Sequence, residues 1–68
     1  MNLTLETEQE TDGRWLAEVP EIEGAMAYGP TREAAMAKAE ALALRVLAER
    51  LDNDEASPMT IHLLLAVE

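Results

Sequence analysis

Carboxylates are the most numerous side chains in this chain that could act in catalysis or bind a metal, with 14 Asp and Glu against 5 Lys and Arg. Glu6 and Glu8 lie in an N-terminal segment of alternating residues, and Glu40 lies in a later helical segment. A nuclease with two metal ions needs carboxylates from several elements that converge on the metals. The C-terminal segment 59–67 has no acid, and Glu6 and Glu8 fall on the polar side of their segment. We therefore expect solvated glutamates, with no catalytic, cofactor or metal site.

The other residue types that could bind or react are also better explained as structural. His62 is the single histidine and the chain has no cysteine, so we expect a partly exposed strand residue, the alternative being a pH-sensitive subunit contact. Trp15 and Tyr28 are the only aromatic residues and have no cluster of basic neighbours, which favours packing over base stacking. Gly24 and Gly29 lack the lysine that follows a phosphate-binding loop, so we interpret them as turn glycines.

The distribution of charge favours a protein partner over a nucleic acid. The formal net charge is −9, and Arg14 is the only basic residue before Gly24. Nucleic-acid binding requires clustered Lys and Arg that replace counterions, and no such cluster is present. A basic protein is the better match, while the alternative is that the acids only maintain solubility. The acids of this region are Glu6, Glu8, Glu10, Asp12, Glu18, Glu21 and Glu23.

The N-terminal half predicts three strands. Residues 2–10 alternate, with Leu3, Leu5 and Thr7 on one side and Glu6, Glu8 and Glu10 on the other, which is typical of a half-buried strand. Residues 11–13 form a short turn, and 14–19 return as a second strand. Pro20 has no N–H and should end that strand, after which 25–28 form a short third strand.

The C-terminal half predicts one helix and one strand. Thr31 is placed as an N-cap, and residues 32–51 contain no Gly or Pro. At 100° per residue, one broad apolar arc should cover the sheet, with Leu42, Val46 and Leu47 as its main anchors. A polar connector then leads to a strand at 59–67. The arc comprises Ala35, Met36, Ala39, Leu42, Ala43, Val46 and Leu47.

This order predicts a single α+β domain over 1–68, a two-layer β-β-β-α-β sandwich. A domain of this size has a small core, so we expect a homo-oligomer, a dimer or tetramer. Leu16 and Leu64 are apolar on otherwise polar strand faces and are the candidate oligomer contact. The longest apolar run, 63–67, is far shorter than a membrane helix. The N-terminus has no basic segment followed by an apolar stretch, so we expect no membrane contact and a cytoplasmic location.

The stretch 12–36 resembles the HicB-like antitoxin family. Its members read, loosely, Asp-Gly-x-aromatic-x-Ala-x-x-Pro-acidic-apolar-x-Gly, then Gly-x-Thr and a long helix. The chain departs from this pattern at Ala25, where a residue such as Cys is common, and at Pro30, where an acid is common. The matching residues are Asp12, Gly13, Trp15, Ala17, Pro20, Glu21, Ile22, Gly24, Gly29, Thr31 and Ala35.

The resemblance implies a partial ribonuclease-H-like sheet with the last strand parallel to the first, and a small antitoxin that neutralises a basic RNA-cleaving toxin by direct protein binding. Antitoxins of this type usually append a DNA-binding domain, whereas this chain ends at Glu68, so we expect no direct DNA repression. The alternative is an orphan homo-oligomeric module with a structural or regulatory role and no catalysis. The candidate partner surfaces are an acidic hairpin face with Glu6, Glu8 and Glu18, and a helix edge with Lys38 and Arg45, which could equally be a solvated face.

Overall fold

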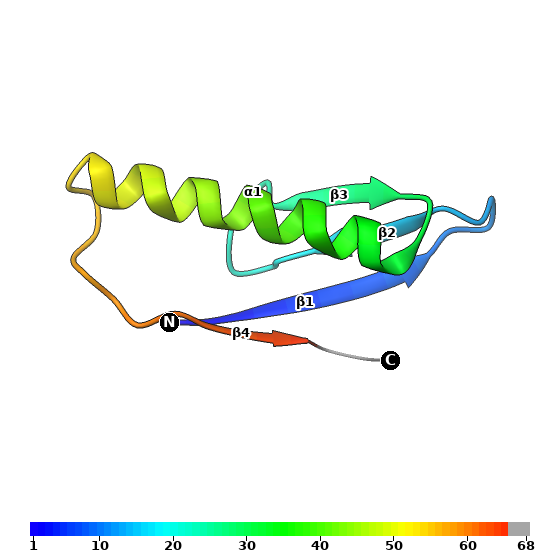
Figure 1. Ribbon diagram of the computed structural model, residues 1–68, viewed down its shortest axis with the longest axis horizontal. Coiled ribbons are helices and arrows are strands. Elements are labelled where there is room, and N and C mark those ends of the chain that lie inside the picture. The colour runs from blue at the N-terminus through cyan, green and yellow to red at the C-terminus, as the bar shows by residue number, and fades with distance from the viewer. Residues whose placement is uncertain (66–68) are drawn as a thin grey trace.

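The computed structural model describes the backbone of residues 1–65 and the side chains of residues 1–62. One helix lies across one face of a sheet whose strand order is β3-β2-β1-β4 (Figure 1). The prediction of an α+β protein with a helix on an antiparallel sheet is confirmed for the first three strands. The elements are β1 (Asn2–Gln9), β2 (Trp15–Glu18), β3 (Met26–Gly29), α1 (Arg32–Asp52) and β4 (His62–Leu65).

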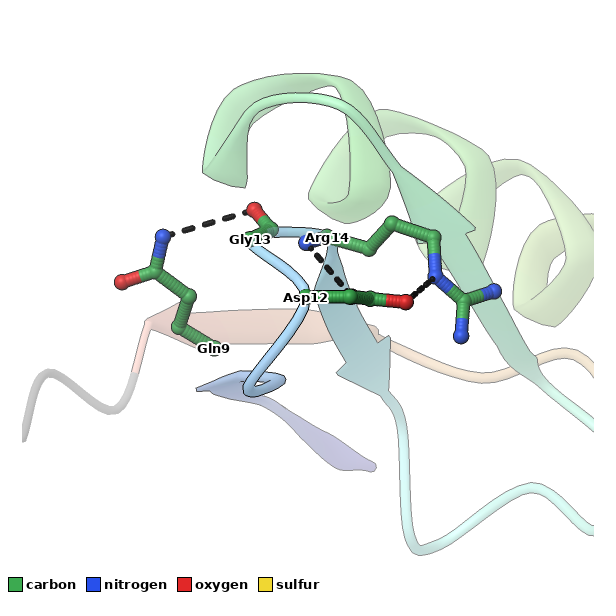
Figure 2. Close-up of polar contacts among 4 residues, drawn as sticks. All are labelled: Gln9, Asp12, Gly13 and Arg14. Carbon is green, nitrogen blue, oxygen red and sulfur yellow. Dashed lines mark hydrogen bonds and ion pairs between the residues drawn. The ribbon is translucent and has the colours of Figure 1, made fainter.

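A hydrogen-bonded turn joins β1 to β2. The Gly13 N–H donates to the Glu10 carbonyl at 3.0 Å, and Gly13 has a φ of +93°, which glycine adopts readily. Asp12 accepts from the Arg14 backbone N–H at 3.0 Å and from its Nε at 2.8 Å (Figure 2). Gln9 Nε2 donates to the Gly13 carbonyl at 3.3 Å across the turn. These contacts fix where β2 begins and so set which residues face outward.

Pro20 lies in the connection from β2 to β3 and ends strand β2, as predicted. The Val19 N–H still donates to the Ala25 carbonyl at 2.8 Å, so these two strands pair beyond their formal ends. The same connection is bonded to β1, because Glu21 Oε1 accepts from the Thr4 backbone N–H at 2.9 Å. That bond lowers the pKa of the Glu21 carboxyl, because a donated N–H stabilises the ionised form.

Both ends of α1 are capped. The Thr31 hydroxyl accepts from the Ala34 N–H at 3.1 Å, which confirms the predicted N-cap. At the other end the Glu55 N–H donates to the Arg50 carbonyl at 2.7 Å and the Asp54 N–H donates to the Leu51 carbonyl at 3.4 Å. This is a Schellman motif, in which Asp54 takes the left-handed position with a φ of +57°.

An alanine row brings α1 close to the sheet. The buried helix residues are Ala35, Ala39, Ala43 and Leu47, and Leu47 is 2% exposed. Leu42 and Val46, which we expected to anchor the helix together with Leu47, are only half-buried at the margin of the core. The core is completed by Leu3, Leu5, Ala17, Val19, Ile22 and Ala25.

β4 differs most from its prediction. It pairs in parallel with β1, with Leu3 opposite Leu63 and Leu5 opposite Leu65 in register. It begins at His62 and not at residue 59, and residues 66 and 67 of the predicted strand lie outside the described residues. Within residues 1–65, α1 packs on β1, β2 and β3 but does not contact β4. No helix of this described part is long and apolar enough to cross a membrane.

Candidate protein-binding surface

The face of the sheet turned away from α1 has no second layer among the described residues (Figure 1). Side chains alternate between the faces of a strand, so the neighbours of the buried residues point to this side. We call this surface the outer face. It comprises Glu6 and Glu8 from β1, Leu16 and Glu18 from β2, and Met26 and Tyr28 from β3.

The predicted acidic hairpin face is brought together on the outer face. Glu6 lies directly opposite Glu18 in the β1–β2 register, and Glu8 lies opposite Leu16. These four residues, together with Thr7, line a shallow hollow of about 150 Å³. Like charges directly opposite each other in a sheet repel, and none of the three glutamates has an ion-pair partner within residues 1–62. A cation from a binding partner would reduce the repulsion between these glutamates.

An exposed apolar area lies beside these carboxylates. Leu16 is opposite Tyr28, and Glu18 is opposite Met26, so the apolar side chains occupy the β3 side of the outer face. Tyr28 and Met26 are 45% and 46% exposed. Acidic and apolar groups together are suited to a protein interface, where apolar burial supplies affinity and charge supplies selectivity.

The aromatic residues behave differently from each other. Trp15 is half-buried and packs against the core, as predicted. Tyr28 has a basic neighbour that sequence reasoning missed, because the Arg14 guanidinium lies 4.5 Å from its ring centroid. Asp12 holds Arg14 in this position, and the bonds from Arg14, first from its backbone N–H, lower the pKa of the Asp12 carboxyl. Asp12, two residues before Arg14, is a local signal for the ion pair between them but not for the contact of Arg14 with Tyr28.

The predicted helix edge does not join the acidic surface. Lys38 and Arg45 are both exposed on α1, which covers the opposite side of the sheet. Lys38 Nζ donates to the Tyr28 carbonyl at 3.5 Å and so borders the β3 edge. Arg45 forms no ion pair within residues 1–62, where Arg14 with Asp12 is the only pair. The two candidate partner surfaces are therefore separate.

Of the two predicted oligomer contacts, Leu16 has its side chain among the described residues. Leu16 is half-buried on the outer face, between the glutamates and Tyr28. Leu64 is in register with Thr4 through its backbone, and its side chain lies outside the described side chains. Oligomerisation through Leu16 would bring the glutamates of two copies together, which charge repulsion disfavours.

A second hollow, of about 240 Å³, lies near the start of α1 and is lined by Thr7, Glu8, Gln9, Trp15 and Arg32. Arg32 Nε donates to Thr7 Oγ1 at 3.1 Å, which ties the first turn of α1 to β1. Its Nη2 atom is buried without a hydrogen-bond partner in the described part of the chain. No group of three His, Cys, Asp or Glu side chains in that part could hold a metal ion.

Comparisons of the chain with protein-family models, with curated proteins and with solved structures find no match.

Proposed function

We propose that this protein is a small antitoxin-like inhibitor, similar to HicB, which neutralises a basic RNA-cleaving toxin by binding it through the outer face. The observation that supports this proposal best is the uncovered sheet face on which Glu6, Glu8 and Glu18 meet around Leu16. The acids have no ion-pair partner within residues 1–62, so a basic partner removes repulsion as it binds.

The two parts of the outer face have different roles in this proposal. The glutamates attract a basic surface over a distance and raise the association rate, an effect that salt weakens. Leu16, Met26 and Tyr28 bury apolar area after contact and lengthen the lifetime of the complex. An acidic protein seated on the RNA-binding surface of a toxin would exclude messenger RNA by both charge and bulk.

The proposal includes the finer fold assignment and the location. The parallel pairing of β4 with β1 supports a partial ribonuclease-H-like, HicB-like sheet, as the residues of the 12–36 stretch imply. Inhibition needs no catalytic group of the inhibitor, so we assign no enzymatic role. A toxin that cleaves messenger RNA acts in the cytoplasm, and we place its inhibitor there.

The test is purification of the full chain from the cells that produce it, at low salt, followed by mass spectrometry of the co-eluting proteins. We expect a small basic ribonuclease, and we expect the purified chain to inhibit RNA cleavage by that enzyme. Recovery of the chain alone would contradict the proposal and favour the homo-oligomeric structural or regulatory module.

A pair of charge-reversal variants locates the contact. Glu6→Lys with Glu18→Lys should abolish inhibition, because both substitutions lie on the outer face. Glu49→Lys with Asp52→Lys changes the net charge equally at exposed positions of α1 and should retain inhibition. Equal loss in both double variants would indicate a general effect of charge and would refute the outer face as the binding site.

A further inference from the structure

A second apolar stripe runs along α1 on the side opposite the sheet. Its members are spaced alternately four and three residues apart, which is the spacing of the inward positions of a coiled coil. At 100° per residue they lie within an arc of about 80°, and its centre is roughly 140° around the helix from the centre of the buried row Ala35, Ala39, Ala43 and Leu47. Leu47 is the buried residue nearest the stripe, about 40° from Leu51. We call this stripe the helix seam; it consists of Ala37, Ala41, Leu44, Ala48 and Leu51.

The helix seam is open to solvent although it contains the two largest exposed apolar side chains of α1. Leu44 is 44% exposed and Leu51 is 36% exposed. Ala37 and Ala48 are exposed, and Ala41 is half-buried. The small alanines allow a second helix to approach closely between the leucines. A solubility role does not explain leucines at these positions, because polar residues would serve it better.

The charges beside the helix seam determine which partner it fits. Glu33 and Glu40 flank it on one side, and Lys38 and Arg45 flank it on the other, followed at the end of α1 by Asp52. In a parallel pair of helices, a residue on the first flank meets the residue five positions later on the other copy. Glu33 then meets Lys38 of the second copy, and Glu40 meets Arg45 of the second copy.

An antiparallel pair would instead bring the two lysine and arginine flanks together, and likewise the two glutamate flanks. None of the four flanking residues forms an ion pair within residues 1–62 of one chain, so their charges are available for a neighbour. The pattern gives two attractive pairs on each side of the seam in the parallel orientation. In an antiparallel pair with Arg45 opposite Arg45 it gives a repulsion there, and the only attraction on that flank is Asp52 with Lys38.

The fold leaves room for this contact. The sheet lies on the opposite side of α1, so two copies can meet at the helix seam with their sheets outward (Figure 1). The C-terminal half of α1 extends past β2 and β3 in the same view, and Leu44 and Leu51 in this half are exposed. The layers of such a dimer would follow the order sheet, helix, helix, sheet.

We propose that the helix seam binds a second copy of this chain, helix to parallel helix. The inference is independent of the toxin proposal, because it uses the face of α1 remote from the sheet. It also differs from an oligomer through Leu16, which would oppose the glutamates of the two outer faces. With three alanines among the five seam residues the buried area is small, so the dimer is weak and forms in a concentration-dependent way.

The first test measures molecular mass by analytical ultracentrifugation of the full chain from about 1 µM to about 1 mM, a range that covers weak self-association. We expect a monomer–dimer equilibrium, and Leu44→Glu should raise its Kd at least about 100-fold, since two leucines lose their apolar contact. Met26→Glu is the matched control, because Met26 is equally exposed but lies on the outer face, and it should leave the Kd within about twofold. Circular dichroism verifies that both variants fold.

A wild-type monomer over the whole range would overturn the proposal. Dissociation by Met26→Glu with no effect of Leu44→Glu would also overturn it, since that result places the contact on the outer face.

The second test determines orientation. Arg45→Glu should raise the Kd about tenfold by replacing two attractions with two repulsions, and adding Glu40→Arg should restore the wild-type value. In an antiparallel dimer Arg45→Glu would tighten binding, which would refute the parallel arrangement.

A single introduced cysteine gives an independent readout, because the chain has none of its own. Leu51→Cys lies at the end of the helix seam, where a parallel dimer brings the two thiols together and copper–phenanthroline should link them within minutes. An antiparallel dimer separates them by roughly 20 Å, at 1.5 Å per residue, and would remain unlinked.

Discussion

Gly29, the last residue of β3, lies close to the first turn of α1. A Cβ added to Gly29 would lie 2.6 Å from the Ala35 backbone N and 3.1 Å from both the carbonyl carbon and the Cβ of Ala34. The backbone of Gly29 itself is not in the left-handed region, so an alanine there would be unstrained apart from this contact. Gly29→Ala therefore tests a purely steric requirement.

The expected cost follows from the atoms that would have to move. Overpacking a core by one methyl group typically costs about 1–3 kcal/mol, and the lower values apply where a side chain can change its rotamer. The nearest atom here is a backbone nitrogen inside a capped first turn, so relief requires a shift of α1 away from the sheet. We expect Gly29→Ala to lower the free energy of unfolding by about 2–3 kcal/mol, which corresponds to a fall in Tm of roughly 10–20 °C for a domain of this size.

The assay is urea and thermal unfolding followed by circular dichroism at 222 nm. Ala34→Gly removes the contact at the Cβ but leaves the Ala35 nitrogen in place, so this second change should not rescue Gly29→Ala. Gly13→Ala is the control for backbone strain without a clash, since its φ is +93° and nothing lies within 4 Å of the added Cβ. It should cost about 1 kcal/mol. A loss below about 0.5 kcal/mol in Gly29→Ala, or its rescue by Ala34→Gly, would refute the reasoning.

Three further predictions concern the helix end, the outer face and the acid response. Asp54→Gly should raise the free energy of unfolding by up to about 1 kcal/mol in urea titrations, because glycine adopts the φ of +57° without strain; a loss would contradict the Schellman assignment. Glu18→Lys should raise stability by about 0.5–1 kcal/mol by turning its repulsion of Glu6 into attraction, and 1 M NaCl should remove most of that gain. The pKa of Glu21 is lowered from its ordinary 4.5 in the folded state, so its contribution is present above pH 4.5 and is lost as pH falls below that value. As the pH falls below 4.5, the urea midpoint of Glu21→Gln should therefore decrease less than that of the wild type. An equal decrease in both proteins would exclude the bond to Thr4 as a source of acid sensitivity.

The element order could be predicted because each segment has a clear period and a clear stop. Strand β1 alternates strictly, Pro20 cannot donate to the ladder, and Thr31 is followed by a long run of helix formers. These are local properties of the chain. The gathering of Glu6, Glu8 and Glu18 was also predictable, since a tight turn between two strands fixes which residues lie opposite each other.

Features that depend on packing between distant segments were not predictable in the same way. Leu42 and Val46 belong to the correct helical arc, yet the alanine row brings α1 so close to the sheet that these longer side chains lie at its margin. The stacking of Arg14 on Tyr28 depends on the register of two strands. Strand β4 starts at His62 because that is where the connector brings the chain beside β1. The local sequence pattern does not determine this position.

The two proposed surfaces have opposite requirements, and this decides how they can coexist. The outer face carries like charges in register, so it repels a second copy and attracts a basic protein. The helix seam has an acidic flank, Glu33 and Glu40, and a basic flank, Lys38 and Arg45, which together favour a second copy in the parallel orientation. A dimer joined at the helix seam would have both outer faces on its outside, so each copy could still bind a partner. The combined prediction is a complex of two chains with two basic partners, in which Leu44→Glu reduces the assembly to one of each without weakening the contact at Glu6 and Glu18. A variant that lost both associations together would show that the surfaces are not independent.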